Sequence, residues 1–254
     1  MRILYLGNNW LGWQVLEWLV EQGEEIVGLV VHPTGRQTYG EEILSTADLP
    51  QERVFSAGDL NSRNRLKEIK SLQPDVGLSV LFGYILRPSV VQILPMGCLN
   101  LHPALLPYNR GAHPNVWSIV EGTPAGVTLH YIDEGIDTGD IVAQHQVPTL
   151  PTDTGESLHH RLEQAAVKLF REAWPLVRTG RARQMQQDQQ NGSHHLVRDV
   201  EDLDRIDLEE HYLGRELINI LRARTFPPYR GAYFEHDGRR IYLRLQLLEE
   251  EDLD

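Results

Sequence analysis

The chain opens with a strand–helix–strand pattern, and this pattern limits the possible folds more than any other feature. The apolar run ILYLG predicts a buried strand that ends at Gly7, and IVGLVV predicts a second one. Between them, apolar residues recur at helical spacing: Leu11, Val15, Leu16 and Leu19. Two strands joined by a helix lie in parallel with a right-handed crossover. We therefore expect an α/β fold with a mostly parallel sheet and helices on both faces.

Buried runs and amphipathic stretches continue this alternation along the chain. Strands are expected within DVGLSVLFGYIL, CLNLH, GVTLHYID and DIVAQHQV, and helices in NSRNRLKEIKSL, in RPSVVQIL and from Thr154 to Trp174. Residues 32–60 mix Pro, Gly and charges, so we expect an irregular surface segment there.

A polar run divides the chain into two expected parts. RARQMQQDQQNGSHH has low hydrophobicity and an Asn-Gly turn signal, which predicts a linker. We therefore predict a large domain over residues 1–183 and a small C-terminal α+β unit over residues 184–254. The small unit should contain the helix YLGRELINILRAR and a β-hairpin that turns at His236-Asp237-Gly238.

Charge and composition argue against several functional classes. The net charge of −12 disfavours a broad surface for polyanions. No apolar run approaches the roughly 20 residues of a membrane span, and MRILYLGNNW lacks the layout of a signal peptide. The single cysteine, Cys98, excludes an internal disulfide and suits a reducing compartment. We expect a cytoplasmic globular protein that binds neither nucleic acid nor membranes.

Asn100 and His102 are the first candidates for chemistry. They are two residues apart on a predicted strand, so their side chains share one face. The strand stops before Pro103, and ligands of open α/β sheets bind at the carboxyl ends of strands. An asparagine can donate to a developing oxyanion while a histidine shuttles a proton. A histidine alone at such a place is more often structural.

An acidic, glycine-containing loop supplies possible partners for this histidine. YIDEGIDTGDI carries the carboxylates Asp133, Glu134 and Asp137. One of them could orient an imidazole or accept a proton. The histidines of the same region are His102, His113 and His130, which raises a metal site as an alternative. Because no HExxH or CxxC spacing is present, we rank a metal below acid–base chemistry and expect none. Nucleophilic catalysis by Cys98 ranks lower still.

Two motifs in fixed order resemble one enzyme family. CLNLHPALLPYNRG followed by AGVTLHYIDEGIDTGDIVAQ is similar to the formyltransferases that use 10-formyltetrahydrofolate. These include methionyl-tRNA formyltransferase, glycinamide ribonucleotide formyltransferase and the sugar-nucleotide N-formyltransferases. The family pattern N-x-H-x-S-L-L-P is matched from Asn100 to Pro107, with Ala104 in place of serine, and D-x-G-x-D-x-G is matched from Asp133 to Gly139. The resemblance covers roughly residues 1–180 and continues weakly in LRARTFPPYRGAYF.

The resemblance implies a Rossmann-like fold, a catalytic trio and a folate site. Asn100 and protonated His102 would stabilise the oxyanion of formyl transfer, and Asp137 would hold His102 and help to remove the amine proton. The formyl donor would be 10-formyltetrahydrofolate. The residues expected to hold it are Phe82, Gly83, Tyr84, Ile85 and Leu86 on one side and Asp133, Gly135 and Ile136 on the other.

The acceptor is inferred from charge and from local residues. From Arg181 onward the chain has 11 Arg, no Lys and 16 Asp or Glu, which disfavours tRNA. The compact glycinamide enzyme lacks an extra C-terminal unit. A nucleotide-linked amino sugar, as used in polysaccharide biosynthesis, fits better. The GNNW stretch lacks the middle glycine of GxGxxG, but backbone N–H groups at a helix start can bind phosphate. The candidate acceptor ligands are Asn8, Asn9, Trp10, Pro107, Tyr108, Arg110 and His113.

Three further expectations complete this interpretation. Trp13 and Trp18 lie on the first helix and should serve packing instead of binding. The two C-terminal strands could form a homodimer interface or cap their own domain. From a different functional class, a non-catalytic protein that binds folate or a nucleotide remains an alternative, and the intact Asn, His and Asp argue against it.

Overall fold

A computed structural model describes residues 1–188 and 190–252, which form two compact units. The first unit contains Met1–His102, Thr128–Gln144 and Ala166–Gln187. The second contains the stretches between these segments and the chain from Asp188 onward. The division into domains 1–183 and 184–254 stays a prediction about the organisation of the sequence.

Seven strands form one mostly parallel sheet in the order β3-β2-β1-β4-β5-β7-β8. β1 pairs in parallel with β2 and β4, and β5 pairs in parallel with β4 but antiparallel with β7. The strands are β1 (Arg2–Gly7), β2 (Glu25–Val31), β3 (Val54–Ser56), β4 (Val76–Val80), β5 (Cys98–His102), β7 (Ala125–Tyr131) and β8 (Ile141–Val147). The predicted α/β class, with a Rossmann-like sheet, is confirmed.

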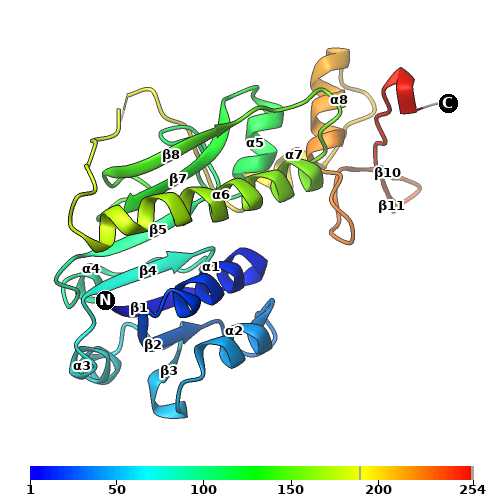
Figure 1. Ribbon diagram of the computed structural model, residues 1–254. Coiled ribbons are helices and arrows are strands. Elements are labelled where there is room, and N and C mark those ends of the chain that lie inside the picture. The colour runs from blue at the N-terminus through cyan, green and yellow to red at the C-terminus, as the bar shows by residue number, and fades with distance from the viewer. Residues whose placement is uncertain (189, 253–254) are drawn as a thin grey trace. The chain divides into compact units, whose positions relative to one another are not determined.

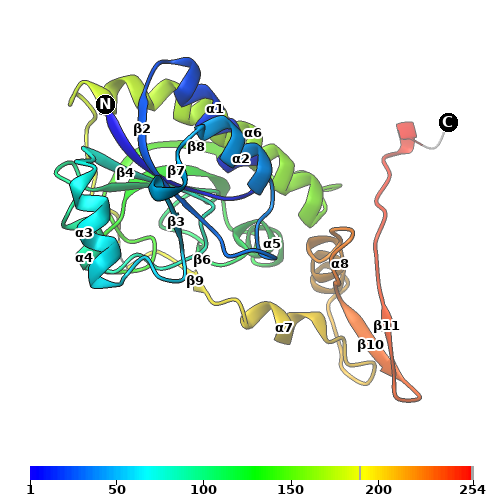
Figure 2. The same ribbon diagram turned by 90° about the horizontal axis from the view of Figure 1, so that it is seen from below.

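Helices cover both faces of this sheet. In the first unit, α1 (Asn9–Glu21) lies on one face, and α3 (Arg63–Ser71) and α4 (Pro88–Val91) lie on the opposite face (Figure 1, Figure 2). The apolar stripe predicted for the first helix is buried. The remaining helices are α2 (Gly40–Ala47), α5 (Pro114–Val120), α6 (Gly155–Arg178), α7 (Asp199–Asp204) and α8 (Gly214–Ala223).

The tryptophans of α1 pack as expected. The Trp13 ring stacks on Tyr39 with their centroids 5.8 Å apart, and its Nε1 donates to Thr46 Oγ1 at 3.1 Å. The Trp18 ring meets Phe170 of α6 edge to face, also at 5.8 Å. Such ring contacts add to the apolar burial that holds a helix on its sheet.

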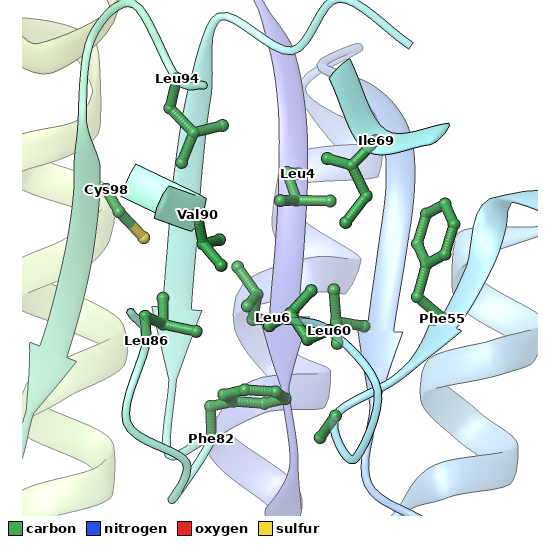
Figure 3. Packing of buried hydrophobic residues seen from close by; sticks show 12 residues of the cluster. Leu4, Leu6, Phe55, Leu60, Ile69, Phe82, Leu86, Val90, Leu94 and Cys98 are labelled. Atoms are coloured by element: carbon green, nitrogen blue, oxygen red, sulfur yellow. The ribbon is translucent and has the colours of Figure 1, made fainter. Parts of the chain in front are cut away.

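An apolar cluster lies between the central strands and helices α3 and α4 (Figure 3). Its buried members are Leu4, Leu6, Val30, Phe55, Ala57, Leu60, Ile69, Phe82, Leu86, Val90, Leu94 and Cys98. Full burial of such a side chain contributes about 1.5–3 kcal/mol. Burial also raises the pKa of the Cys98 thiol to about 12, so Cys98 stays protonated at neutral pH and is a poor nucleophile.

The prediction of an irregular segment over residues 32–60 is wrong. This segment contains α2, a 3-10 turn (Gln51–Arg53) and the edge strand β3. Only Ile43 and Ala47 of α2 are buried, and β3 has three residues. Two buried positions and a three-residue strand produce no periodicity that a sequence pattern can reveal.

The second unit contains the predicted hairpin of β10 (Tyr233–His236) and β11 (Arg239–Tyr242). Asp237 and Gly238 both have positive φ, as a two-residue hairpin turn requires. The end of the polar run expected as a linker is structured within this unit, because β9 (His194–His195) pairs in parallel with β6 (Arg110–Gly111). A short 3-10 turn spans Glu250–Asp252.

Candidate active site

The end of β5 presents polar side chains on one face of the sheet. Asn100 and His102 alternate with apolar neighbours, so they share a face as predicted. On the adjacent antiparallel strand β7, His130 lies directly opposite Asn100. Directly opposed residues project on the same side, and the sheet thereby places an amide and two imidazoles together.

Asp137 reaches these groups from the loop between β7 and β8. Its Oδ2 lies 3.6 Å from His102 Nε2, and Asn100 Nδ2 donates to its Oδ1 at 3.3 Å. The His102 and Asp137 side chains are only 8% and 13% exposed, so water screens their interaction weakly. The structure therefore brings together Asn100, His102 and Asp137.

His130 belongs to this cluster and was considered from sequence only as a metal ligand. Its Nδ1 lies 2.8 Å from the Tyr131 carbonyl oxygen, which can only accept, so Nδ1 carries the proton. Its Nε2 is then the acceptor for Asn100 Nδ2 at 3.2 Å. The same Nε2 lies 3.5 Å from Asp137 Oδ1. The signal that sequence analysis left unused was the alternation in GVTLHYID, which places His130 on the side of Thr128.

The loop that carries Asp137 is organised by Asp133. Asp133 Oδ1 accepts hydrogen bonds from Gly135 N at 3.0 Å and Thr138 Oγ1 at 2.6 Å. Gly139 is required where the loop returns, because a Cβ there would lie 2.0 Å from the Tyr131 carbonyl oxygen. Asp137 itself has a φ of 53°, in the left-handed region that costs energy for a residue with a side chain.

The segment predicted to hold folate follows β4. Phe82 and Leu86 are buried, Gly83 has a φ of 68°, and Tyr84 packs partly buried against the apolar cluster. Ile85 by contrast is 75% exposed. Ile136 in the Asp137 loop is 38% exposed. Each of the two predicted folate segments thus carries an exposed isoleucine that can contact a flat, apolar ring.

His32, which the sequence did not indicate, supports the segment after β4. Its Nε2 contacts the Phe82 carbonyl oxygen, and its ring packs against the rings of Phe82 and Tyr84 at 5.4 and 5.0 Å. His32 follows β2, at the same end of the parallel strands. The backbone of the predicted folate segment is therefore contacted by the residue that follows β2.

Asn8 and Asn9 join two strand ends. Asn8 Oδ1 accepts from Thr38 N, and Asn9 N donates to Thr38 O, both at 2.9 Å. These bonds tie the loop after β1 to the loop after β2. Trp10 is half-buried in the first turn of α1. The roles of Asn8, Asn9 and Trp10 in acceptor binding stay predictions.

The other predicted acceptor residues lie in the second unit. Arg110 is buried, and its backbone N donates to Ser193 O at 3.0 Å. Its neighbour Asn109 is fully buried and bonds through Nδ2 to Ser118 Oγ and Thr123 Oγ1 at 2.8 and 2.9 Å. His113 is exposed and starts α5. The assignments of Pro107, Tyr108, Arg110 and His113 stay predictions.

The described residues contain neither a metal-ligand group nor a membrane-crossing helix. Within residues 1–188 and 190–252, no three His, Cys, Asp or Glu side chains are grouped so that they could hold a metal ion. Over the same ranges, no helix combines the length and apolar character needed to cross a membrane.

Comparison with protein families gives two matches. A family model described as formyl transferase matches residues 33–174. A second model, described as the N-formyltransferase dimerization C-terminal domain, matches residues 199–250. The two matches together cover both motifs and the C-terminal hairpin.

The relatives differ in the acceptor that their own names describe. A methionyl-tRNA formyltransferase from Geobacter sulfurreducens is 31% identical over 96% of this chain and 77% of its own length. The formyltransferase PseJ from Anoxybacillus kamchatkensis, solved with UDP-4,6-dideoxy-4-formamido-L-AltNAc and tetrahydrofolate, is 31% identical with a TM-score of 0.57 over 80% of this chain and 89% of its own. A 4-N formyltransferase from Francisella tularensis shares the fold, with 23% identity and a TM-score of 0.82 over 98% of each chain.

Proposed function

The chain belongs to the formyl transferase family, and from this premise we propose that it transfers a formyl group from 10-formyltetrahydrofolate to the amine of a nucleotide-linked amino sugar. Membership makes the protein a formyl-transferring enzyme. The identity of the donor and of the acceptor is the proposal.

The observation that carries the proposal is the cluster of the half-buried Asn100 and Asp137 with the buried His102. In formyl transfer, the amine nitrogen bonds to the formyl carbon and negative charge develops on the formyl oxygen. Protonated His102 is a donor that stabilises this oxyanion, and Asn100 Nδ2 is the second donor when one of its two hydrogens turns from His130 or Asp137 to the formyl oxygen. Asp137, 3.6 Å from His102, holds the imidazolium and helps to remove the proton of the attacking amine. Collapse of the intermediate breaks the bond between the formyl carbon and the folate nitrogen, and that nitrogen takes up the proton that the amine has lost.

Two segments can bind a folate donor: residues 82–86, which follow β4, and residues 133–136, which precede Asp137. Exposed Ile85 and Ile136 offer apolar contact to a pterin ring, and the backbone around Gly83 offers polar groups to its edge. The related PseJ structure contains tetrahydrofolate, which supports the same donor class here.

The negative net charge of the chain and its sequence identity to PseJ support an amino-sugar acceptor over tRNA. The chain has 36 Asp and Glu against 24 Lys and Arg, whereas a protein that docks tRNA uses clustered cations to neutralise phosphates. PseJ, which carries a nucleotide-linked formamido sugar, is as identical to this chain as the tRNA-directed relative is. Methionyl-tRNA and glycinamide ribonucleotide are the alternative acceptors.

An acceptor panel tests this proposal. The protein is incubated with 10-formyltetrahydrofolate and, separately, with nucleotide-linked amino sugars, glycinamide ribonucleotide and methionyl-tRNA, and products are identified by mass spectrometry. We expect a formamido product from an amino-sugar nucleotide alone. Formylation of methionyl-tRNA alone would refute the sugar assignment. Calorimetric binding of folate without turnover of any amine would favour the non-catalytic alternative.

Replacement of His130 by leucine should lower kcat about fivefold to tenfold. The change leaves Asn100 Nδ2 without its imidazole acceptor, and one such hydrogen bond is worth about 1 kcal/mol. Steady-state kinetics of His130→Leu, Asn100→Ala and the double variant measure the effect. We expect little further loss from His130→Leu once Asn100 is gone. Fully additive losses would show that His130 does not act through Asn100.

The C-terminal match supports a homodimer, since its family is described as a dimerization domain. The β10–β11 hairpin exposes Ile241 and Tyr242, which are apolar groups of the kind that an interface buries. Sedimentation velocity of the full chain tests this assembly, and a monomer at micromolar concentration would exclude it.

A further inference from the structure

We propose that Gln187 is a positioning residue for Asp137, a role that rests on the proposed function of Asp137 in formyl transfer. Gln187 follows α6 in the polar run that the sequence marked as a linker, and it lies beyond the residues matched by the formyl transferase model. Its side chain is nevertheless buried, with the whole residue 8% exposed.

The side-chain amide of Gln187 donates hydrogen bonds to the backbone on both sides of Thr138. Its Nε2 donates to the Asp137 carbonyl oxygen at 2.8 Å and to the Gly139 carbonyl oxygen at 2.7 Å. A carboxamide nitrogen has two hydrogens, and each is directed to one of these carbonyls. Since both partners only accept, the nitrogen and not the oxygen of the amide faces the loop.

The two hydrogen bonds from Gln187 act on the part of the loop with a strained backbone. Asp137 has a φ of 53°, in the left-handed region, which aspartate tolerates better than most residues with a Cβ but which still costs energy. Asp133 secures the entry of the loop through Gly135 N and Thr138 Oγ1. Gln187 holds the C-terminal part of the loop through the carbonyl oxygens of Asp137 and Gly139. The carbonyl direction at Asp137 sets the orientation of its peptide plane, and hence the direction in which the carboxylate leaves the backbone.

The segment that carries Gln187 is hydrogen-bonded to the start of β8. Two residues earlier, Met185 and Ile141 exchange backbone hydrogen bonds, with Ile141 N to Met185 O at 2.8 Å and Met185 N to Ile141 O at 2.9 Å. Ile141 begins β8 directly after the Asp137 loop. The segment that carries Gln187 is therefore bonded to the start of β8, the strand that follows the Asp137 loop.

Substitutions at Gln187 separate positioning from general stability. Gln187→Leu keeps the bulk but removes both donors, and Gln187→Glu directs acceptors at two carbonyl oxygens. Gln186→Leu is the matched control, because Gln186 is the adjacent residue and is exposed. We expect both Gln187 variants to lose kcat roughly 10- to 100-fold, because a catalytic group displaced by about 1 Å can lose 10²-fold. KM for the acceptor should stay within about twofold, since Asp137 acts in the transition state.

Hydrogen–deuterium exchange gives a readout that needs no turnover. Peptides covering residues 132–141 should exchange faster in Gln187→Leu than in the wild type or Gln186→Leu, while peptides from β1 and β4 should be unchanged. Faster exchange with lower kcat supports the proposal. Unchanged exchange in 132–141 would overturn it, as would a normal kcat despite faster exchange. If the wild-type protein formylates no acceptor, the proposed function fails, and the exchange result still decides whether Gln187 holds the Asp137 loop.

Discussion

Replacement of His102 by alanine should reduce kcat by about 10²–10⁴-fold while the protein stays folded. The imidazole is nearly buried beside Asp137, where its positive charge is poorly screened and can stabilise an oxyanion strongly. Alanine removes both the charge and the donor. Steady-state kinetics with saturating formyl donor measure the loss, and thermal unfolding checks that the variant folds.

His145→Ala is the matched control for this prediction. His145 also lies on a strand of the sheet, but its side chain is exposed. Its loss should leave kcat unchanged. A second variant, His102→Gln, keeps a donor of similar reach without a titratable ring, and we expect kcat between those of alanine and wild type. Turnover of His102→Ala within about threefold of wild type would contradict the assignment, because a positioned acid is worth at least about 10².

Asp137→Asn should lower kcat by a similar factor of about 10²–10⁴. The substitution preserves the size of the side chain, but it removes the negative charge that holds protonated His102 and the group that helps to take the amine proton. Asn100 Nδ2 can still donate to the remaining oxygen, so the local geometry should survive. The measured loss of kcat therefore reports the charge and basicity of Asp137.

Glu134→Gln controls for the change in charge. Glu134 is an exposed residue in the same loop, and its neutralisation should leave kcat unchanged. An equal loss in Glu134→Gln and Asp137→Asn would show that kcat follows the net charge of the loop. Asp137 would then have no specific part in the reaction.

The sheet and the shared face of Asn100 and His102 could be predicted because their signals are local. Runs such as ILYLG and IVGLVV are apolar on both faces, as strands buried between two helical layers must be. The two-residue spacing of Asn100 and His102 determines that they share a face. Asp137 was identified through its motif, since no local pattern tells how far a loop side chain reaches.

The remaining features depend on contacts between distant residues. His130 meets Asn100 only because β7 is antiparallel to β5 in one register. Gln187 lies in a polar stretch typical of a linker, and its burial depends on the carbonyl groups of the Asp137 loop. The segment over residues 32–60 buries too few side chains to show a period. Polar residues whose partners are backbone groups leave no pattern in a single sequence.

Transfer of an isotope-labelled formyl group tests the central claim most directly. The protein is mixed with 10-formyltetrahydrofolate labelled at the formyl carbon and with an excess of a nucleotide-linked 4-amino sugar, and the label is followed by NMR. We expect the label to appear as an amide on the sugar nitrogen with the wild-type protein, and to remain on folate with Asp137→Asn. Label that stays on folate or is released as formate with every amino-sugar nucleotide would contradict the account.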